Sequence, residues 1–192
     1  IFLNKNVFCE VIDNTTSRGR IVRFNVKEDF RKVIDKLGKT PLPYYIKREP
    51  TEKDRDLYQT VYAKNVGSVA APAAGMHFTK ELLKKIEKKG VKIAYITLHL
   101  GLGMFRLVEV EDLSKHRMDS EFYEISQEYS DMINQSIIKR KKVIAVGTSV
   151  CRALESSVIT GSFVRPSKGW TDRFIHPPNS MSIVDKLITN FH

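Results

Sequence analysis

The sequence predicts an α/β fold that contains a parallel sheet, and three observations indicate it. Two apolar runs, over 69–71 and 91–100, are typical of strands buried on both faces. Each run ends in a small-residue turn that carries a histidine. From residue 51 onward such runs alternate with helical patterns, which implies parallel pairing and right-handed crossovers. Because ligands of open α/β sheets bind at the carboxyl ends of the strands, His77 and His99 are candidate site residues.

The first part of the chain has a different pattern, which predicts an antiparallel start. Strands are expected over 7–13 and 20–26, separated by turn-prone residues, and a short helix over 28–37. Three prolines then interrupt the pattern, so the domain boundary is expected in a linker over 41–51.

The elements of the second part follow from apolar spacing and capping residues. Helices are expected over 54–63, 79–89, 126–139 and 150–159, and strands over 68–71, 93–100 and 143–146. Thr79 is the expected N-cap of the second helix, and Gly90 closes it. The side chains of Leu82, Leu83 and Ile86 are expected to form the buried stripe of that helix.

Composition and charge limit the class of protein. The 192 residues are 42% hydrophobic, enough for one good core and a small second one. A formal charge of +10 favours a polyanionic partner such as nucleic acid, although a basic surface can also serve solubility alone. Cys9 and Cys151 form no CxxC pair, so neither a disulfide framework nor a zinc site is suggested. No apolar run approaches a membrane span, and we expect a cytoplasmic protein with no membrane partner.

The glycines of the GLG sequence, Gly101 and Gly103, mark a place where backbone can approach a ligand closely. A dinucleotide fingerprint is disfavoured, because residues 104–108 suggest extended chain instead of the helix that this motif requires. Arg106 is available there for a carboxylate or phosphate. The alternative is an ordinary bulge or turn.

The AVGTS sequence at 145–149 ends a buried strand and opens a helix, a corner that suits an anion. The free amide groups of the first helical turn lie beside the hydroxyls of Thr148 and Ser149, and Arg152 follows one turn later. The alternative is that one of the two hydroxyls only caps the helix.

Aromatic and basic residues supply candidate contacts to a nucleic acid. Trp170 follows Gly169 in a predicted surface turn and is the best platform for adenine or an unstacked base, the alternative being a core anchor. Asp172 can hydrogen-bond a ribose or a base edge. The candidate phosphate contacts are Lys47, Arg48, Lys84, Lys88 and Lys141. The alternative is that these charged side chains only form a solvated surface.

Six segments also resemble, in the same order, the signature segments of the S-adenosylmethionine:tRNA ribosyltransferase-isomerase family of queuosine biosynthesis. They read AAPAAGMHFT, TLHLGLGMFR, HRMDSEFYEI, AVGTSVCRALES, GWTDRFI and VDKLITNFH. The resemblance implies a Rossmann-like α/β domain over 48–192 and, over 1–47, the tail of a smaller antiparallel β-barrel domain inserted into it. It also implies that the chain is a fragment of a longer, monomeric protein.

The reaction implied by the resemblance moves the ribosyl part of S-adenosylmethionine to 7-aminomethyl-7-deazaguanine at the tRNA wobble position. The product is epoxyqueuosine-tRNA, and adenine and methionine are released. S-adenosylmethionine is then a substrate, tRNA is the partner, and no true cofactor is needed.

A proton must leave the carbon beside the sulfonium, and adenine departs more easily when protonated, so groups that titrate near neutrality are required. His77, His99 and His116 are the leading candidates, because an unperturbed histidine has a pKa of about 6.5. Each of them can instead be a structural residue. The carboxylates Glu121 and Glu155 would need burial to raise their pKa. No HxxxH or CxxC spacing argues for a metal.

Three departures from the family pattern stand out: residues 176–181 replace a common PG sequence, Asp119 stands where histidine is common, and GTSVCRALE differs from GTTSVRTLE. We therefore assign Asp119 no proton-transfer role. An RNA-binding module without catalysis is the alternative function, and a small-molecule S-adenosylmethionine enzyme, which the basic charge argues against, is a third.

Overall fold

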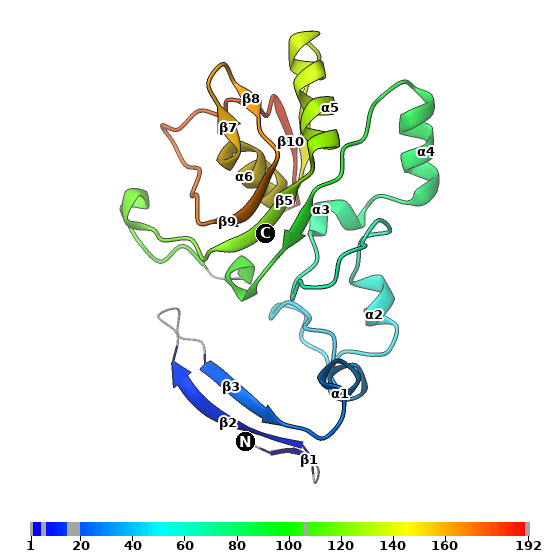
Figure 1. Ribbon diagram of the computed structural model, residues 1–192, viewed down its shortest axis with the longest axis vertical. Helices are drawn as coiled ribbons and strands as arrows, with labels where there is room; N and C mark the ends of the chain where they lie inside the picture. The colour runs from blue at the N-terminus through cyan, green and yellow to red at the C-terminus, as the bar shows by residue number, and fades with distance from the viewer. Residues whose placement is uncertain (1, 5–6, 15–19, 106, 191–192) are drawn as a thin grey trace. The chain divides into compact units, whose positions relative to one another are not determined.

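The computed structural model describes residues 2–4, 7–14, 20–105 and 107–190, and it has a mixed α/β fold with several small sheets (Figure 1). The chain divides into two compact units, residues 1–40 and 41–192. The division falls at the start of the predicted proline-containing linker.

The first unit is an antiparallel sheet followed by one helix. Strands β1 (Phe2–Asn4), β2 (Val7–Asn14) and β3 (Arg20–Asn25) pair in that order, and helix α1 covers Phe30–Leu37. The helix begins later than predicted because the Asp29 side chain caps it, accepting a hydrogen bond from the Arg31 N–H at 2.8 Å. The predicted antiparallel start is confirmed.

The second unit opens with three helices, α2 (Asp54–Leu57), α3 (Ala73–Met76) and α4 (Lys80–Lys88). Helix α4 confirms the predicted caps: the Thr79 hydroxyl accepts from the Leu82 N–H at 3.1 Å, and Gly90 follows with a positive φ of 80°. The predicted helix over 54–63 is wrong beyond Leu57. The predicted buried stripe of α4 is also wrong, because no residue of α4 is buried and Leu82 is 40% exposed.

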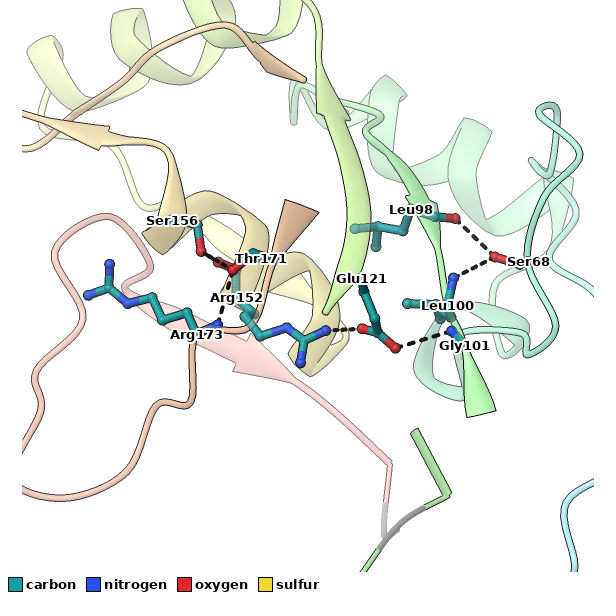
Figure 2. A network of polar contacts seen from close by, with 9 residues as sticks. All are labelled: Ser68, Leu98, Leu100, Gly101, Glu121, Arg152, Ser156, Thr171 and Arg173. Atoms are coloured by element: carbon teal, nitrogen blue, oxygen red, sulfur yellow. Dashed lines mark hydrogen bonds and ion pairs between the residues drawn. The ribbon is translucent and has the colours of Figure 1, made fainter. Parts of the chain in front are cut away.

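The predicted strand over 68–71 is irregular chain that is attached to the following strand by hydrogen bonds. The Ser68 hydroxyl donates to the Leu98 carbonyl at 3.0 Å and accepts from the Leu100 N–H at 2.9 Å (Figure 2). The Val69 N–H donates to the Leu100 carbonyl at 2.9 Å. This segment therefore lies beside the strand that begins at Thr97 without forming a ladder.

The main sheet of the second unit is antiparallel. Its strands β4 (Thr97–His99), β5 (Glu121–Ile125) and β9 (Ser167–Thr171) pair in the order β4-β5-β9. The parallel pairing predicted for the strand over 93–100 is therefore wrong, because β4 pairs antiparallel with β5. Strand β5 was not predicted, since it alternates buried and half-buried residues and is not a continuous apolar run. A separate two-stranded hairpin joins β7 (Val158–Ile159) to β8 (Phe163–Val164).

Parallel pairing occurs between β6 (Ile144–Val146) and β10 (Lys186–Ile188). Between them in sequence comes α6 (Thr148–Ser156), and α5 (Gln127–Ile138), which is capped by Ser126, precedes β6. Short 3-10 turns cover Leu102–Phe105 and Leu113–Lys115, the first of them where extended chain was predicted.

The core of this unit lies where β5, β6, α5 and α6 meet (Figure 1). Its largest buried apolar side chains belong to Tyr123, Ile125, Ile133, Leu154, Val164, Ile183 and Val184. This core fixes the carboxyl end of β6 and the start of α6, which form one wall of the candidate site.

Candidate functional site

A pocket of about 480 Å³ opens beside the start of α6 in the second unit. Its walls come from α3, the turn after β4, the segment before β5, the start of α6, the chain after β9 and the segment around β10. Five predicted site residues line it, namely Gly103, His116, Thr148, Ser149 and Arg152.

The N-terminus of α6 faces this pocket with its amide groups open. Gly147 is the N-cap, with φ 98° and ψ 140°, and its N–H donates to the Ile188 carbonyl at 2.8 Å. Among the described residues no side chain caps this helix, so the alternative of a Thr148 or Ser149 cap is wrong. The first amides of a helix have no intrahelical acceptor, and the helix dipole adds positive potential. This corner can hold an anionic group.

Arg152 lies one turn into α6 and is paired with Glu121 of β5 (Figure 2). The side chains are only 9% and 7% exposed, respectively. Glu121 also accepts a hydrogen bond from the Gly101 N–H at 3.2 Å, so one carboxylate connects the GLG turn to α6. Burial lowers the pKa of the Arg152 guanidinium below its ordinary value, while the negative charges of Asp172 and Asp119 oppose that shift. The pair places a buried cation and a buried anion in the pocket wall.

His116 and Asp119 lie on the segment that leads into β5, and both line the pocket. The half-buried His116 ring packs against Phe174 with centroids 4.7 Å apart. The group that approaches Gly103 closely is Asp119, since a Cβ on Gly103 would lie 2.3 Å from the Asp119 Oδ2, and the approach of a ligand there stays a prediction.

The other two candidate histidines lie outside the residues that line the pocket. His77 is exposed, and its Nε2 lies 3.1 Å from the side-chain nitrogen of Asn190, which does line the pocket. The His99 ring stacks on Phe122 with centroids 5.1 Å apart. Its Nδ1 is buried and has no hydrogen-bond partner within the described part of the chain.

Four further predicted residues also fall outside the described pocket lining. Gly101 is connected to the pocket through the hydrogen bond from its N–H to Glu121, and Asp172 through the effect of its negative charge on the pKa of Arg152. Trp170 lies in strand β9 instead of a turn and is 69% exposed, so the core-anchor alternative is wrong. Arg106 lies outside the described residues.

The predicted phosphate contacts are exposed side chains away from the pocket lining. Lys47, Lys84, Lys88 and Lys141 are all exposed. Arg48 is exposed as well, but its guanidinium donates two hydrogen bonds, of 2.7 and 2.6 Å, to the carboxylate of Asp54.

The comparisons with known proteins identify the family. A sequence model of the family described as "Queuosine biosynthesis protein" matches residues 1–192. The chain belongs to this family.

Queuosine biosynthesis proteins of three bacteria show how closely it matches. The chain is 52% identical to the S-adenosylmethionine:tRNA ribosyltransferase-isomerase of Cytophaga hutchinsonii, over 100% of the chain and 56% of that relative. It is 52% identical to the enzyme of the same name from Flavobacterium psychrophilum, over 97% and 54%. It is 51% identical to the enzyme of the same name from Chloroherpeton thalassium, over 100% of the chain and 56% of that relative. The chain thus spans about half the length of these curated relatives.

Among solved structures, the S-adenosylmethionine tRNA ribosyltransferase of Thermotoga maritima is similar with a TM-score of 0.46. It is 24% identical to the chain, and the match covers 98% of the chain and 48% of that structure.

The pocket also contains residues of this queuosine-family chain that sequence reasoning missed. Arg173, Met181 and Asn190 line it, and all three come from the C-terminal part of the chain. Met181 belongs to the loop that departs from the family pattern, and its sulfur lies 3.3 Å from that of Cys151. Arg173 and Asn190 lie in signature segments, but no local pattern assigned any of the three residues to a site, because only the tertiary fold brings them to α6.

Glu155 is not among the described residues that line the pocket, and its role is structural. Its carboxylate is buried and accepts hydrogen bonds from the backbone N–H groups of Ser182, Ile183 and Val184, at 2.9, 2.9 and 3.1 Å. It therefore holds the segment that follows Met181 against α6, and a proton-transfer role for Glu155 does not fit.

Two further features concern the described ranges, 2–4, 7–14, 20–105 and 107–190. No group of three or more His, Cys, Asp or Glu side chains there could hold a metal ion. No helix there is long and apolar enough to cross a membrane.

Proposed function

We propose that this chain carries the catalytic pocket of an S-adenosylmethionine:tRNA ribosyltransferase-isomerase. The enzyme would move the ribosyl part of S-adenosylmethionine to 7-aminomethyl-7-deazaguanine at the tRNA wobble position and isomerise it, giving epoxyqueuosine-tRNA, adenine and methionine. It would act as a cytoplasmic monomer with S-adenosylmethionine as a substrate and no true cofactor. The family and the names of the relatives support this reaction.

One structural observation carries the proposal. All six segments that resemble the family signature contribute lining residues to the same pocket, although they are spread over 70–192. Pro72, Gly103, His116, Thr148, Arg173 and Asn190 represent the six segments in chain order. A pocket that brings such segments together with polar and charged side chains is the default place for a ligand site. The pocket volume of about 480 Å³ is in the range typical of small-molecule sites.

The pocket offers separate groups for two parts of S-adenosylmethionine. The methionine carboxylate would bind at the open amides of Thr148 and Ser149, with the guanidinium of Arg152 as its charged neighbour. The ribosyl part would lie beside Gly103, which lines the pocket next to Asp119.

His116 is our proposed proton-transfer residue. It is the candidate histidine that lines the pocket, and its contact with Phe174 fixes the ring. An imidazole can take the proton from the carbon beside the sulfonium or deliver one to the departing adenine. The sulfonium already acidifies that carbon, so orientation in the pocket contributes as much as basicity.

The finer domain assignment is also part of the proposal. Residues 1–47 would be the tail of an inserted β-barrel domain, supported by the antiparallel sheet β1-β2-β3. Residues 48–192 would be most of a Rossmann-like domain, supported by the parallel strands β6 and β10 with α6 between them in sequence.

Adenine release tests the reaction class. The chain is incubated with S-adenosylmethionine and tRNA carrying the aminomethyl-deazaguanine base, and adenine is measured by chromatography. Adenine release that requires this tRNA is expected, and His116→Gln should lower the rate by about 10²- to 10⁴-fold. His77→Gln is the matched control and should retain most of the rate. Salt-sensitive tRNA binding without adenine release would instead indicate an RNA-binding module.

A further inference from the structure

Three aromatic rings form a row on one face of the antiparallel sheet β4-β5-β9. His99 is the register partner of Phe122, and Phe122 that of Trp170, so the three side chains point to the same face. The His99 and Phe122 rings are stacked, and Trp170 meets Phe122 edge-on with centroids 5.8 Å apart. We call these three residues the aromatic row.

The row lies on the outer face of its sheet. Along β5, Glu121, Tyr123 and Ile125 are buried, whereas Phe122 on the opposite face is half-buried. Trp170 is the single tryptophan of the chain and is 69% exposed. An exposed indole in a regular strand contributes little to a core, which leaves its ring free to contact a ligand.

A cation lies beside the row. The Lys168 ammonium group is 6.0 Å from the centroid of Phe122 and 3.4 Å from the Glu124 carboxylate. Its side chain is 68% exposed, so it can also reach toward solvent. An aromatic face with a lysine next to it can stack on the base of a nucleotide and contact the phosphate of the same nucleotide.

We propose that the aromatic row is the surface on which an unpaired base of the RNA substrate stacks. Proteins that recognise single-stranded RNA use aromatic side chains on a sheet face in this way, because every base has a π-face. The adenine of S-adenosylmethionine is a poor occupant, because none of the three rings is among the described residues that line the pocket. The inference takes from the proposed function that the substrate is RNA.

Trp170 fluorescence tests this directly, since the chain has no second tryptophan. The probes are an RNA hairpin with the sequence of a tRNA anticodon arm and a fully paired RNA duplex of the same length. We expect the hairpin to quench the fluorescence and the duplex to leave it unchanged at the same ionic strength.

Three variants identify the stacking contribution. Measured by filter binding, Trp170→Ala should weaken hairpin binding by about 5- to 150-fold, the loss expected for one base–aromatic stack. Trp170→Tyr should restore most of the affinity. Tyr44→Ala removes an aromatic residue of similar exposure, 65%, outside the sheet and should change nothing.

Several results would overturn the inference. One is an unchanged affinity for the hairpin in Trp170→Ala, and another is equal quenching of Trp170 fluorescence by the duplex. A third is Trp170 fluorescence that neither acrylamide nor RNA quenches, which would show that protein covers this face. Failure here is separable from failure of the proposed function. Adenine release with an unchanged KM for tRNA in Trp170→Ala rejects only the stacking surface, whereas hairpin quenching without any adenine release rejects only the enzyme.

Discussion

At the scale of single residues, Glu121 connects two parts of the candidate pocket. Its carboxylate binds the buried Arg152 guanidinium and accepts from the Gly101 N–H. A buried cation that loses its partner is costly, because no water replaces the lost interaction. Glu121 therefore contributes to stability and also to the position of Arg152 beside the open end of α6.

Glu121→Gln should lower both stability and ligand affinity. The amide keeps the size of the side chain but leaves Arg152 without its anionic partner, so we expect a loss of about 1–3 kcal/mol in the free energy of unfolding. Affinity for S-adenosylmethionine, measured by calorimetry, should fall as well. Glu124→Gln in the same strand is the control, because its surface pair with Lys168 contributes little. Equal effects of the two substitutions would contradict the role of Glu121.

A second residue-scale prediction concerns Asp54, which is 4% exposed. Its pKa lies well below the ordinary value, mainly because Arg48 and then the Thr51 N–H donate hydrogen bonds to the ionised carboxylate. A depressed pKa means that the ionised group adds stability above the ordinary carboxyl pKa of about 4 and loses it as the pH falls below that value.

Asp54→Asn should therefore be less stable than the parent chain at pH 7, and the difference should shrink as the pH falls below about 4. Urea midpoints of both proteins at a series of pH values measure it. Asp56→Asn, two residues later in the same helix, is the control. A difference that stays constant down to strongly acidic pH would argue against the ion pair.

At the scale of elements, the start of α6 depends on an unusual backbone conformation. Gly147 has φ 98° and ψ 140°, a region that residues with a Cβ rarely adopt. The conformation turns the chain from β6 into α6 and exposes the first amides of the helix to the pocket. The geometry of the proposed carboxylate site is thus set by a single glycine.

Gly147→Ala should cost about 1–3 kcal/mol in stability and weaken S-adenosylmethionine binding. Chemical denaturation and calorimetry give the two values. Gly169→Ala is the matched control, since an added Cβ there would meet nothing within 4 Å and φ is not positive. Wild-type binding by Gly147→Ala would show that the start of α6 takes no part in the site.

The elements that the sequence predicted well are those with local signals. The cap Thr79 located the start of α4, because a capping hydroxyl and the helix that it starts are adjacent in sequence. The partner of β4 could not be predicted in this way. Strand β5 has charged residues within its alternating pattern, and one of them, Glu121, is buried only because Arg152 neutralises it.

At the scale of the whole molecule, the candidate site combines segments that no local pattern connects. Histidines after apolar runs suggested His77 and His99, yet the histidine in the pocket is His116, which follows a 3-10 turn. The AVGTS corner was predicted as part of the site, and Thr148 and Ser149 do line the pocket; this prediction was possible because the open amides of a helix start depend on adjacent residues alone. The C-terminal contributions required the fold.

The positive charge of the whole chain leads to a prediction on salt. Binding of tRNA should weaken steeply as salt rises, because phosphate contacts release counterions. Lys84→Gln and Lys88→Gln should each reduce the slope of log affinity against log salt by about one. Lys142→Gln should have a smaller effect, because Asp185 already pairs with that lysine at 2.8 Å. Filter binding at several salt concentrations measures the slopes, and equal slopes for all variants would exclude α4 from the RNA surface.

Hydrogen–deuterium exchange with and without S-adenosylmethionine tests most directly whether signature segments that are distant in sequence build one ligand site. The account predicts that the ligand slows exchange around 147–152, 116–121 and 187–190 together, and leaves α4 and strands β2 and β3 unchanged. Ligand binding without protection at the start of α6, or protection confined to other elements, would contradict it.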